Sequence, residues 1–139
     1  MTEVVSIPDI AVSGLRANRT RMNVIANNIA NSLTTRTAKG GAFRRQLAIL
    51  RGEQISPSAN PASFGVRVRK IVDDPSPFRT VFDPGHPDAD EAGYVDYPNV
   101  NLAVEMVNLV SAQRGYEANV AILVSNKRMT QKALEIIQA

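Results

Sequence analysis

The chain of 139 residues has no cysteine, no tryptophan and one histidine, and only 5% of its residues are aromatic. The absence of cysteine excludes disulfides and thiolate metal sites, and it suits an oxidising or extracytoplasmic location as well as the cytosol. Because His86 stands alone, no histidine pair for a metal and no Ser–His–Asp set with a spare base is available. No phosphate-binding glycine loop or nucleophile elbow occurs either, so we expect a protein that is not an enzyme and has no cofactor.

Long apolar runs are also missing. No lysine or arginine precedes Arg16, and no apolar run near the N-terminus is longer than Ile10-Ala11-Val12. A secretory signal needs a basic start and an apolar core, so we expect no cleavable signal peptide. Nothing approaches the roughly 20 apolar residues of a transmembrane helix, and we therefore expect no direct membrane span.

What the sequence does contain is a long amphipathic pattern at each end, predicted to form helices over residues 6–32 and 102–138. Both patterns repeat in steps of four and three, the spacing of a heptad seam. The first seam comprises Ala11, Leu15, Asn18, Met22, Ile25 and Ile29. The second comprises Leu102, Met106, Leu109, Gln113, Tyr116, Val120, Leu123, Lys127, Thr130, Leu134 and Ile137.

The two predicted helices differ in length. At 1.5 Å per residue the first spans about 39 Å and the second roughly 55 Å. The shorter helix cannot cover the longer one. Part of the apolar face of the second helix is therefore expected to meet another chain.

Local signals set the expected ends of these helices. Pro8 and Asp9 suit a first helical turn, where a missing N–H and a negative charge are both tolerated. The β-branched cluster at residues 34–37 and the pair Gly40-Gly41 should end the first helix. The second helix should start after Pro98, with Asn99 or Asn101 as its cap.

The middle of the chain is predicted to form strands and turns. Strands are predicted at residues 42–51, 64–72 and 78–82. In the second, Val66 and Val68 alternate with Arg67 and Arg69, the pattern of a half-exposed strand, and the third lies between two proline-rich turns. The expected fold is mainly α with a small β element, in which the two coiled-coil-type helices pack together. It divides the chain into an N-terminal helical part (1–33), a middle part rich in strands and turns (34–98) and a C-terminal helical part (99–139).

The net charge is only +3, but basic and acidic residues are strongly segregated along the sequence. Residues 36–70 carry eight basic side chains and one acidic one, a net of +7, whereas residues 73–105 carry eight acidic and one basic, a net of −7. Such blocks favour self-complementary contacts, within the middle part or between subunits. The alternative is two solvated loops of opposite sign.

Asparagines recur at every fourth position in the first helix, at Asn23, Asn27 and Asn31. Because asparagine lowers helix propensity, such a ladder has a cost. It indicates either hydrogen bonding across a packed helix seam or a solvated polar face, and the spacing alone does not decide between them.

The turn after residue 82 contains four acidic side chains, Asp83, Asp88, Asp90 and Glu91. Carboxylate oxygens could bind calcium, but these residues lack the order of an EF-hand loop. A polar turn rich in proline and glycine is the favoured interpretation.

Several motifs resemble those of bacterial flagellar rod and hook proteins, the axial proteins of the flagellum. The N-terminal motifs cover residues 13–15 and 21–31. The middle motifs, at residues 74–78 and 83–87, resemble the proximal-rod members in particular. The C-terminal motifs cover residues 93–95, 97–100, 105–107 and 115–120. Together they extend over nearly the whole chain in the right order.

This resemblance implies a structural subunit of the rod, the shaft of the basal body that crosses the periplasm. It implies unfolded export by the flagellar type III apparatus, and an inner tube formed by the terminal helices. The implied partners are FlgB, FlgF, FliE, copies of the chain itself and, more distantly, FlgG. The expected assembly interface comprises Leu15, Met22, Asn23, Ile25, Asn27, Ile29, Asn31, Leu102, Met106, Leu109, Tyr116, Val120, Leu123, Leu134 and Ile137.

The main alternative is a small binding module that uses the basic residues 36–70 for nucleic acid or an acidic membrane surface. The adjacent acidic block and the scarcity of stacking aromatics argue against it. A small hydrolase ranks third, since no catalytic dyad is evident.

Overall fold

The computed structural model describes residues 7–55 and 64–138. Its helices and strands, in chain order, are α1 (Ile7–Ala30), β1 (Gln46–Gln54), β2 (Phe64–Asp73), β3 (Arg79–Phe82), β4 (Tyr94–Tyr97) and α2 (Leu102–Gln138). Mainly helical ends with a small β middle were predicted, and this coarse fold is confirmed.

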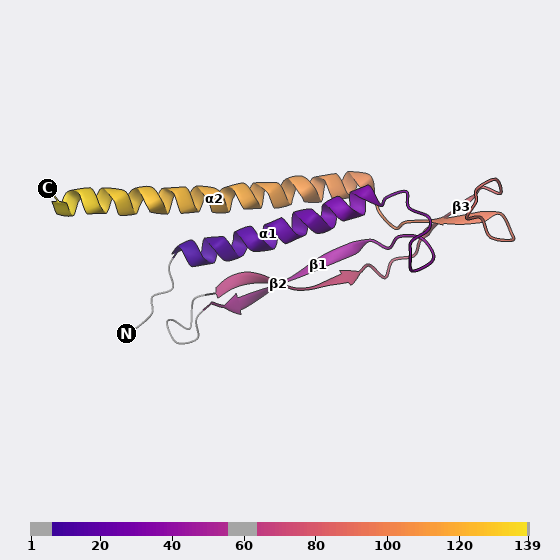
Figure 1. Cartoon of the computed structure of the whole chain (residues 1–139), viewed down its shortest axis with the longest axis horizontal. Coiled ribbons are helices and arrows are strands. Elements are labelled where there is room, and N and C mark those ends of the chain that lie inside the picture. The colour runs from indigo at the N-terminus through magenta and orange to yellow at the C-terminus, as the bar shows by residue number, and fades with distance from the viewer. Residues whose placement is uncertain (1–6, 56–63, 139) are drawn as a thin grey trace.

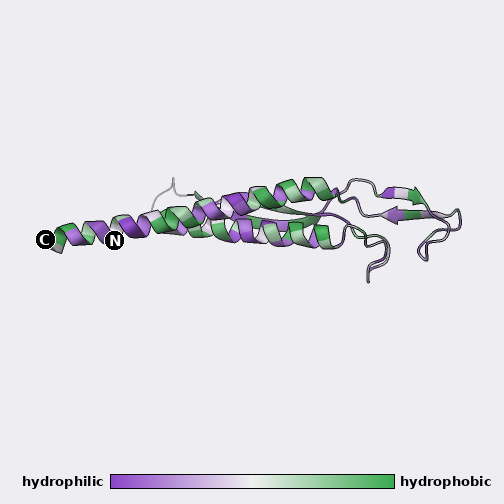
Figure 2. Ribbon diagram, turned by 90° about the horizontal axis from the view of Figure 1, so that it is seen from above, coloured by the Kyte–Doolittle hydropathy of each residue, from purple (hydrophilic) through white to green (hydrophobic). Residues whose placement is uncertain are grey.

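The elements form an elongated molecule (Figure 1). α1 lies between α2 and the β1–β2 pair, and the two helices run antiparallel. The β3–β4 pair projects beyond the end of the helices where α1 finishes and α2 begins. At the opposite end, α2 continues past the start of α1 (Figures 1 and 2).

The ends of α1 agree with the local signals. Pro8 and Asp9 lie in its first turn, as predicted. Near its end, the Asn31 side chain donates a hydrogen bond of 2.9 Å to the carbonyl oxygen of Asn27. Such a bond helps to satisfy the last carbonyl groups of a helix. Further on, Gly40 (φ 86°) and Gly41 (φ 69°) adopt left-handed conformations that disfavour other residues.

Asn101 is the cap of α2. Its side-chain oxygen accepts a hydrogen bond of 3.2 Å from the backbone N–H of Val104, and its carbonyl oxygen accepts one of 2.9 Å from that of Glu105. Asn99, the other predicted cap, does not cap α2, and its side chain accepts a hydrogen bond from the backbone N–H of Arg45. α2 then extends for 37 residues against the 24 of α1.

Two separate antiparallel strand pairs form the β middle. In the first pair, the register runs from Gln46↔Asp73 to Gln54↔Phe64, with a bulge between Ile49 and Leu50. The second pair joins β3 to β4, a strand that the sequence analysis missed. β4 has only four residues, but its alternation, with Val95 1% exposed, is that of a half-buried strand.

The core of the described residues is thin. Its buried apolar side chains are mostly alanine and valine: Ala11, Ala17, Val24, Ile25, Ala42, Val95 and Ala112. Many larger apolar side chains remain exposed, among them Val107 (69%) on α2. The chain thus leaves much of its apolar surface in contact with water, although burying such surface is the main driving force of folding.

The heptad prediction is not confirmed as the packing between α1 and α2. Leu109, Tyr116 and Leu123 of the predicted seam are half-buried, whereas Leu102 and Met106 are exposed. The buried residues of α2 are instead Glu105 and Ala112, and Gly115 and Asn119 lie against Asn18 and Gly14 of α1. Small residues let two helix backbones come closer than the leucines of a coiled coil allow.

Candidate assembly interface

Two reciprocal glycine–asparagine pairs define where the helices cross. A Cβ atom on Gly14 of α1 would lie 2.8 Å from the Asn119 amide of α2, and one on Gly115 would lie 3.0 Å from the Asn18 amide. Each helix thus presents a glycine to the asparagine of the other. Within each helix the glycine precedes the asparagine by four residues, one helical turn.

A buried polar cluster lies at the other end of the helix pair. Asn28 of α1 and Glu105 of α2 are 1% and 0% exposed, and the Asn28 amide donates to the Glu105 carboxylate at 2.9 Å. Asn28 also pairs with the backbone of Gln46, donating to its carbonyl oxygen (2.9 Å) and accepting from its N–H (2.8 Å). One asparagine side chain therefore joins α1 to both α2 and β1.

Arg45, the residue before β1, extends this cluster. Its Nε and Nη2 donate to Oε1 of Glu105 at 2.9 Å and 2.6 Å, and its Nη1 donates to Asp74 at 3.0 Å. Its backbone N–H donates to Asn99 at 2.8 Å. We call Asn28, Arg45, Asp74, Asn99 and Glu105 the polar hub. It connects both helices to the chain segments that lead into both strand pairs.

Burial, hydrogen bonds and neighbouring charges shift the pKa of two residues of the hub, Arg45 and Asp74. Burial works against the charge of Arg45, but its bonds with Glu105 and Asp74 outweigh that effect and raise the pKa of Arg45. The hydroxyl and backbone N–H of Ser76, with help from Arg45, lower the pKa of Asp74 from 3.8 to about 2. No buried side-chain nitrogen or oxygen in the described part of the chain lacks a hydrogen-bond partner.

The shifted pKa predicts an acid-sensitive contribution from Asp74. Because its folded-state pKa is below its ordinary value, its carboxylate stabilises the fold above pH 3.8, and this contribution is lost as the pH falls towards about 2. Thermal unfolding of the chain and of Asp74→Asn should be followed from about pH 6 to about pH 2. The unfolding temperature of the variant should fall less over the acid range, and parallel curves would contradict the prediction.

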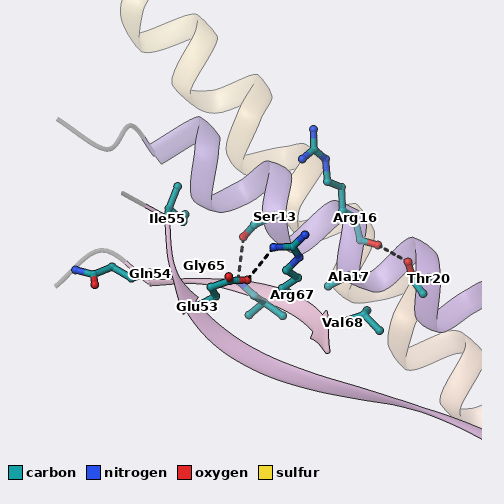
Figure 3. A pocket seen from close by; sticks show the side chains of 11 residues that line it. Ser13, Arg16, Ala17, Thr20, Glu53, Gln54, Ile55, Gly65, Arg67 and Val68 are labelled. Atoms are coloured by element: carbon teal, nitrogen blue, oxygen red, sulfur yellow. Dashed lines mark hydrogen bonds and ion pairs between the residues drawn. The ribbon is translucent and has the colours of Figure 1, made fainter. Parts of the chain in front are cut away.

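A groove of about 570 Å³ separates α1 from the open end of the β1–β2 pair (Figure 3). Ser13 closes it at one point, since its hydroxyl accepts a hydrogen bond of 3.1 Å from the backbone N–H of Val66. A Cβ atom on Gly65 would lie 2.7 Å from that hydroxyl oxygen, so glycine permits the close contact. Arg67 and Glu53 form an ion pair of 3.3 Å across the strands.

The predicted interface residues of α1 do not lie on one face. Ile25 is buried, and Leu15, Met22, Ile29 and Asn31 are half-buried, whereas Asn23 and Asn27 are exposed. On α2, the exposed members of the predicted set are Leu102, Met106, Val120, Leu134 and Ile137. These exposed residues are available for contacts between chains, which stay a prediction.

The asparagines at positions 23, 27 and 31 form neither a row of hydrogen bonds across the helix seam nor a fully solvated polar face. Asn27 donates a hydrogen bond of 3.1 Å to the Gln46 side chain, and Asn31 bonds back to Asn27, but Asn23 is exposed. The asparagine that crosses the packed seam is Asn28, which the fourfold spacing passed over.

The sequence analysis also missed Gly14, Gly115 and Asn119 at the helix crossing, and Arg45 and Glu105 in the hub. One signal for the crossing was the matching spacing of a glycine four residues before an asparagine in both helices. Gly14, Glu105, Gly115 and Asn119 also lie within the motifs that resemble the axial proteins, but those motifs do not show what the residues contact. Nothing local marks Arg45, because its partners are distant in sequence.

The opposite charge blocks meet within the chain. Arg45 binds Asp74 and Glu105, and Arg36 lies 3.2 Å from Asp88. This outcome matches the first half of the self-complementarity prediction, contacts within the chain. It does not support the alternative of a free basic module for nucleic acid or membranes.

Side chains that could bind a metal do not gather in the described part of the chain. Histidine and acidic side chains there form no group of three that could hold a metal ion. Within the acidic turn, the side chain of Asp90 accepts hydrogen bonds from the backbone N–H groups of Ala92 (2.9 Å) and Tyr94 (2.8 Å). Among the described helices, none has the length and hydropathy that crossing a bilayer requires.

Comparison with known proteins identifies the setting of this interface. Residues 9–36 match the family model described as flagella basal body rod protein, and residues 91–136 match the C-terminal model of the flagellar basal body rod proteins FlgEFG. The two matches cover the two helical ends that carry the crossing.

Relatives extend the similarity over almost the whole chain. The flagellar basal-body rod protein FlgC of Borreliella burgdorferi is 44% identical over 94% of this chain and 95% of its own length. The FlgC proteins of Yersinia enterocolitica (42%, over 97% and 98%) and Bacillus subtilis (44%, over 92% and 94%) are similarly close. The chain therefore belongs to the FlgC family of flagellar basal-body rod proteins.

Proposed function

We propose that the chain is a non-enzymatic structural subunit of the flagellar rod, in the proximal part of the drive shaft that transmits torque and houses the export channel. Its family membership supports a role in the basal body. The observation that carries the proposal is the apolar surface of α2, which the chain leaves uncovered on several sides.

The exposed apolar side chains of α2 do not gather in one stripe. Val104, Val107 and Val110 are 49%, 69% and 50% exposed, and Ile122 and Val124 further along are 45% and 44% exposed. Figure 2 shows hydrophobic residues at several places along the helix. A helix with apolar residues all round belongs in the interior of a larger structure.

Neighbouring subunits are the proposed cover for this surface. Met106 and Val120 belong to the predicted heptad seam and are exposed, so coiled-coil contacts would form between chains rather than within one. Contacts that join different surfaces of identical subunits produce helical assemblies. We propose FlgB, FlgF, FliE, other copies of this chain and, more distantly, FlgG as neighbours, and the flagellar type III apparatus as the export route without a cleaved signal.

An aspartate on the exposed face of α2 tests the proposal. Val107→Asp should abolish swimming motility, because a charge buried in a subunit interface has no partner there. The isolated variant should keep the helical circular dichroism of the original chain, since Val107 is 69% exposed in it. Leu109→Asp and Leu123→Asp should also block rod assembly, but both residues are half-buried within the chain.

The matched control is Glu117→Asp, which keeps an exposed carboxylate on the same helix. It should leave swimming unchanged. Motile cells that carry Val107→Asp, with the variant present in their basal bodies, would refute the role of this face.

The C-terminal part of α2 should become ordered fully only on assembly. Within α2 of the isolated chain, trypsin should cut first at Lys127, Arg128 and Lys132 and later at Arg114. Since Gly14 lies against Asn119 in the antiparallel helices, the first three sites lie beyond Ile7, where α1 begins, whereas Arg114 lies beside α1. In purified basal bodies the same sites should be protected. Equal protection of all four sites in the isolated chain would contradict the prediction.

A further inference from the structure

The β3–β4 pair and the turn that joins its strands form a small unit, residues 79–97, which we call the tip. The rings of Phe82 and Tyr94 meet edge to face, with 5.2 Å between their centres. The His86 ring of the turn lies 6.3 Å from the ring of Tyr97 in β4. Because these contacts hold the turn against the strands, the tip is expected to move as one body.

The strands of the tip touch nothing outside it. Among the described helices and strands, β3 and β4 contact only each other. They project beyond the end of the helix pair (Figure 1). A unit that is joined to a larger body by two chain segments alone can turn about those segments as hinges. The direction of the tip therefore depends on side chains outside the strands.

Arg44 and Asn99 hold the segment that leads into β3. Nη1 of Arg44 donates to the carbonyl oxygens of Asp74 (3.0 Å) and Ser76 (2.8 Å), and the Asn99 amide donates to the same two oxygens (3.2 and 3.0 Å). The Arg44 guanidinium also lies 4.1 Å from the centre of the Phe78 ring, a cation–π contact. Since Arg44 precedes β1 and Asn99 follows β4, three segments of the chain are joined at the base of the tip.

A second attachment connects the turn of the tip to the loop after α1. The Asp88 carboxylate accepts hydrogen bonds from the Thr35 hydroxyl (2.8 Å) and from Nη1 of Arg36 (3.2 Å). The loop is itself closed where it begins and ends, because the N–H of Phe43 donates to the carbonyl oxygen of Thr34 at 2.9 Å. The turn is thus tied to the end of α1 at a place distant in sequence from Arg44 and Asn99. We call Thr35, Arg36, Arg44, Asp88 and Asn99 the bracket.

We propose that the bracket fixes the direction of the tip relative to the helix pair, with Arg44 and Asp88 as its positioning residues. Without it, the tip would turn about the segments at residues 74–78 and 98–101. The role of the bracket in the rod rests on the proposed function, because a subunit that carries load between its neighbours must keep its parts in one arrangement.

Distances between two spin labels on the full chain test the bracket. The chain has no cysteine, so Glu91→Cys in the tip and Ser111→Cys on α2 supply the only labelling sites, and both positions are exposed. Pulsed electron paramagnetic resonance measures the distribution of distances between the labels. With the bracket intact, this distribution should be narrow and have one maximum. Arg44→Ala together with Asp88→Ala should broaden it, because both attachments are lost.

The matched control is Arg51→Ala with Glu117→Ala, which also removes one basic and one acidic side chain. Both residues are exposed and lie outside the bracket, so the distribution should stay narrow. Arg44→Lys is a milder second variant: it keeps the charge but not the planar fork of the guanidinium, and its distribution should have an intermediate width. All variants should keep the helical circular dichroism of the original chain.

The outcomes separate the bracket from the proposed function. If the variant without Arg44 and Asp88 keeps its helical signal and a distribution as narrow as the control's, the bracket is wrong and the rod role stands. A broad distribution with the bracket intact also overturns it. In cells, the same variant should swim less well than the control, and equal swimming with the variant present in basal bodies overturns the role of the bracket in the rod. If the unaltered chain is absent from purified basal bodies, the proposed function itself fails, whatever the distances in the isolated chain show.

Discussion

Replacing Glu105 by alanine should lower the free energy of unfolding by about 3–5 kcal/mol, the range for breaking a buried ion pair from one side. Glu105 is fully buried and accepts hydrogen bonds from Arg45 (2.9 and 2.6 Å) and Asn28 (2.9 Å). Alanine removes one acceptor from each partner, so that Asn28 keeps only the carbonyl oxygen of Gln46 and the charge of Arg45 has Asp74 alone beside it. Urea unfolding followed by circular dichroism measures the loss.

Two variants check that the loss comes from the hub. Glu117→Ala removes an exposed carboxylate from the same helix and should change stability by less than about 0.5 kcal/mol. Glu105→Gln keeps an oxygen for Asn28 without the charge, so its loss should be intermediate. A loss below about 1 kcal/mol for Glu105→Ala, the size of one ordinary hydrogen bond, would show that the hub adds little to stability.

The second large effect is expected at the helix crossing. Gly14→Val should destabilise the chain by about 3 kcal/mol, the upper range for overpacking. Its first side-chain atom would lie 2.8 Å from the Asn119 amide, and that amide is held by a bond of 2.7 Å to the carbonyl oxygen of Gly115. Since valine has a better helix propensity than glycine, the loss would be steric.

A compensating change tests the steric explanation. Asn119→Ala removes the atoms that the new side chain meets, so the double variant Gly14→Val with Asn119→Ala should recover part of the lost stability. Ala26→Val, at an exposed position of α1, is the control for valine in this helix and should be nearly neutral. Thermal unfolding of these variants beside the original chain gives the comparison, and additive losses in the double variant would contradict the explanation.

Both effects have a common structural consequence. At the crossing and in the hub, the helices meet through glycine, asparagine and an ion-paired glutamate, while several large apolar side chains of α2, such as Val107 and Met106, stay exposed. The apolar residues of α2 therefore remain available for other chains. The polar hub also links the helix pair to the segments that carry the strands, because Asn28, Arg45 and Asn99 come from three different parts of the sequence.

The helices could be predicted because their signals are local. Pro8 and Asp9 mark the start of α1, and Asn101 caps α2 through its own neighbours. Strands at residues 42–51 and 64–72 were also expected in outline, whereas their antiparallel pairing came only from the structure. β4 was missed, since four residues give too little alternation to separate a strand from a turn.

The contacts between the helices could not be predicted in the same way. A heptad pattern selects apolar residues at fixed steps, so it favoured Leu102 and Met106, which are exposed. It passed over Asn28 and Glu105, because a buried polar residue is indistinguishable in sequence from a solvated one until its partner is known.

The sequence by itself determined that this chain has two long helices of unequal length, a β middle and more apolar helix surface than one chain can cover. These follow from periodicity, capping and length, which depend on neighbours in the chain. The tertiary structure alone decided which faces meet. Arg45 joins Glu105 and Asp74 across 60 and 29 residues, and Gly14 admits Asn119. Packing and charge pairing act between residues that only folding brings together, and they decide which surface of α2 stays free for assembly.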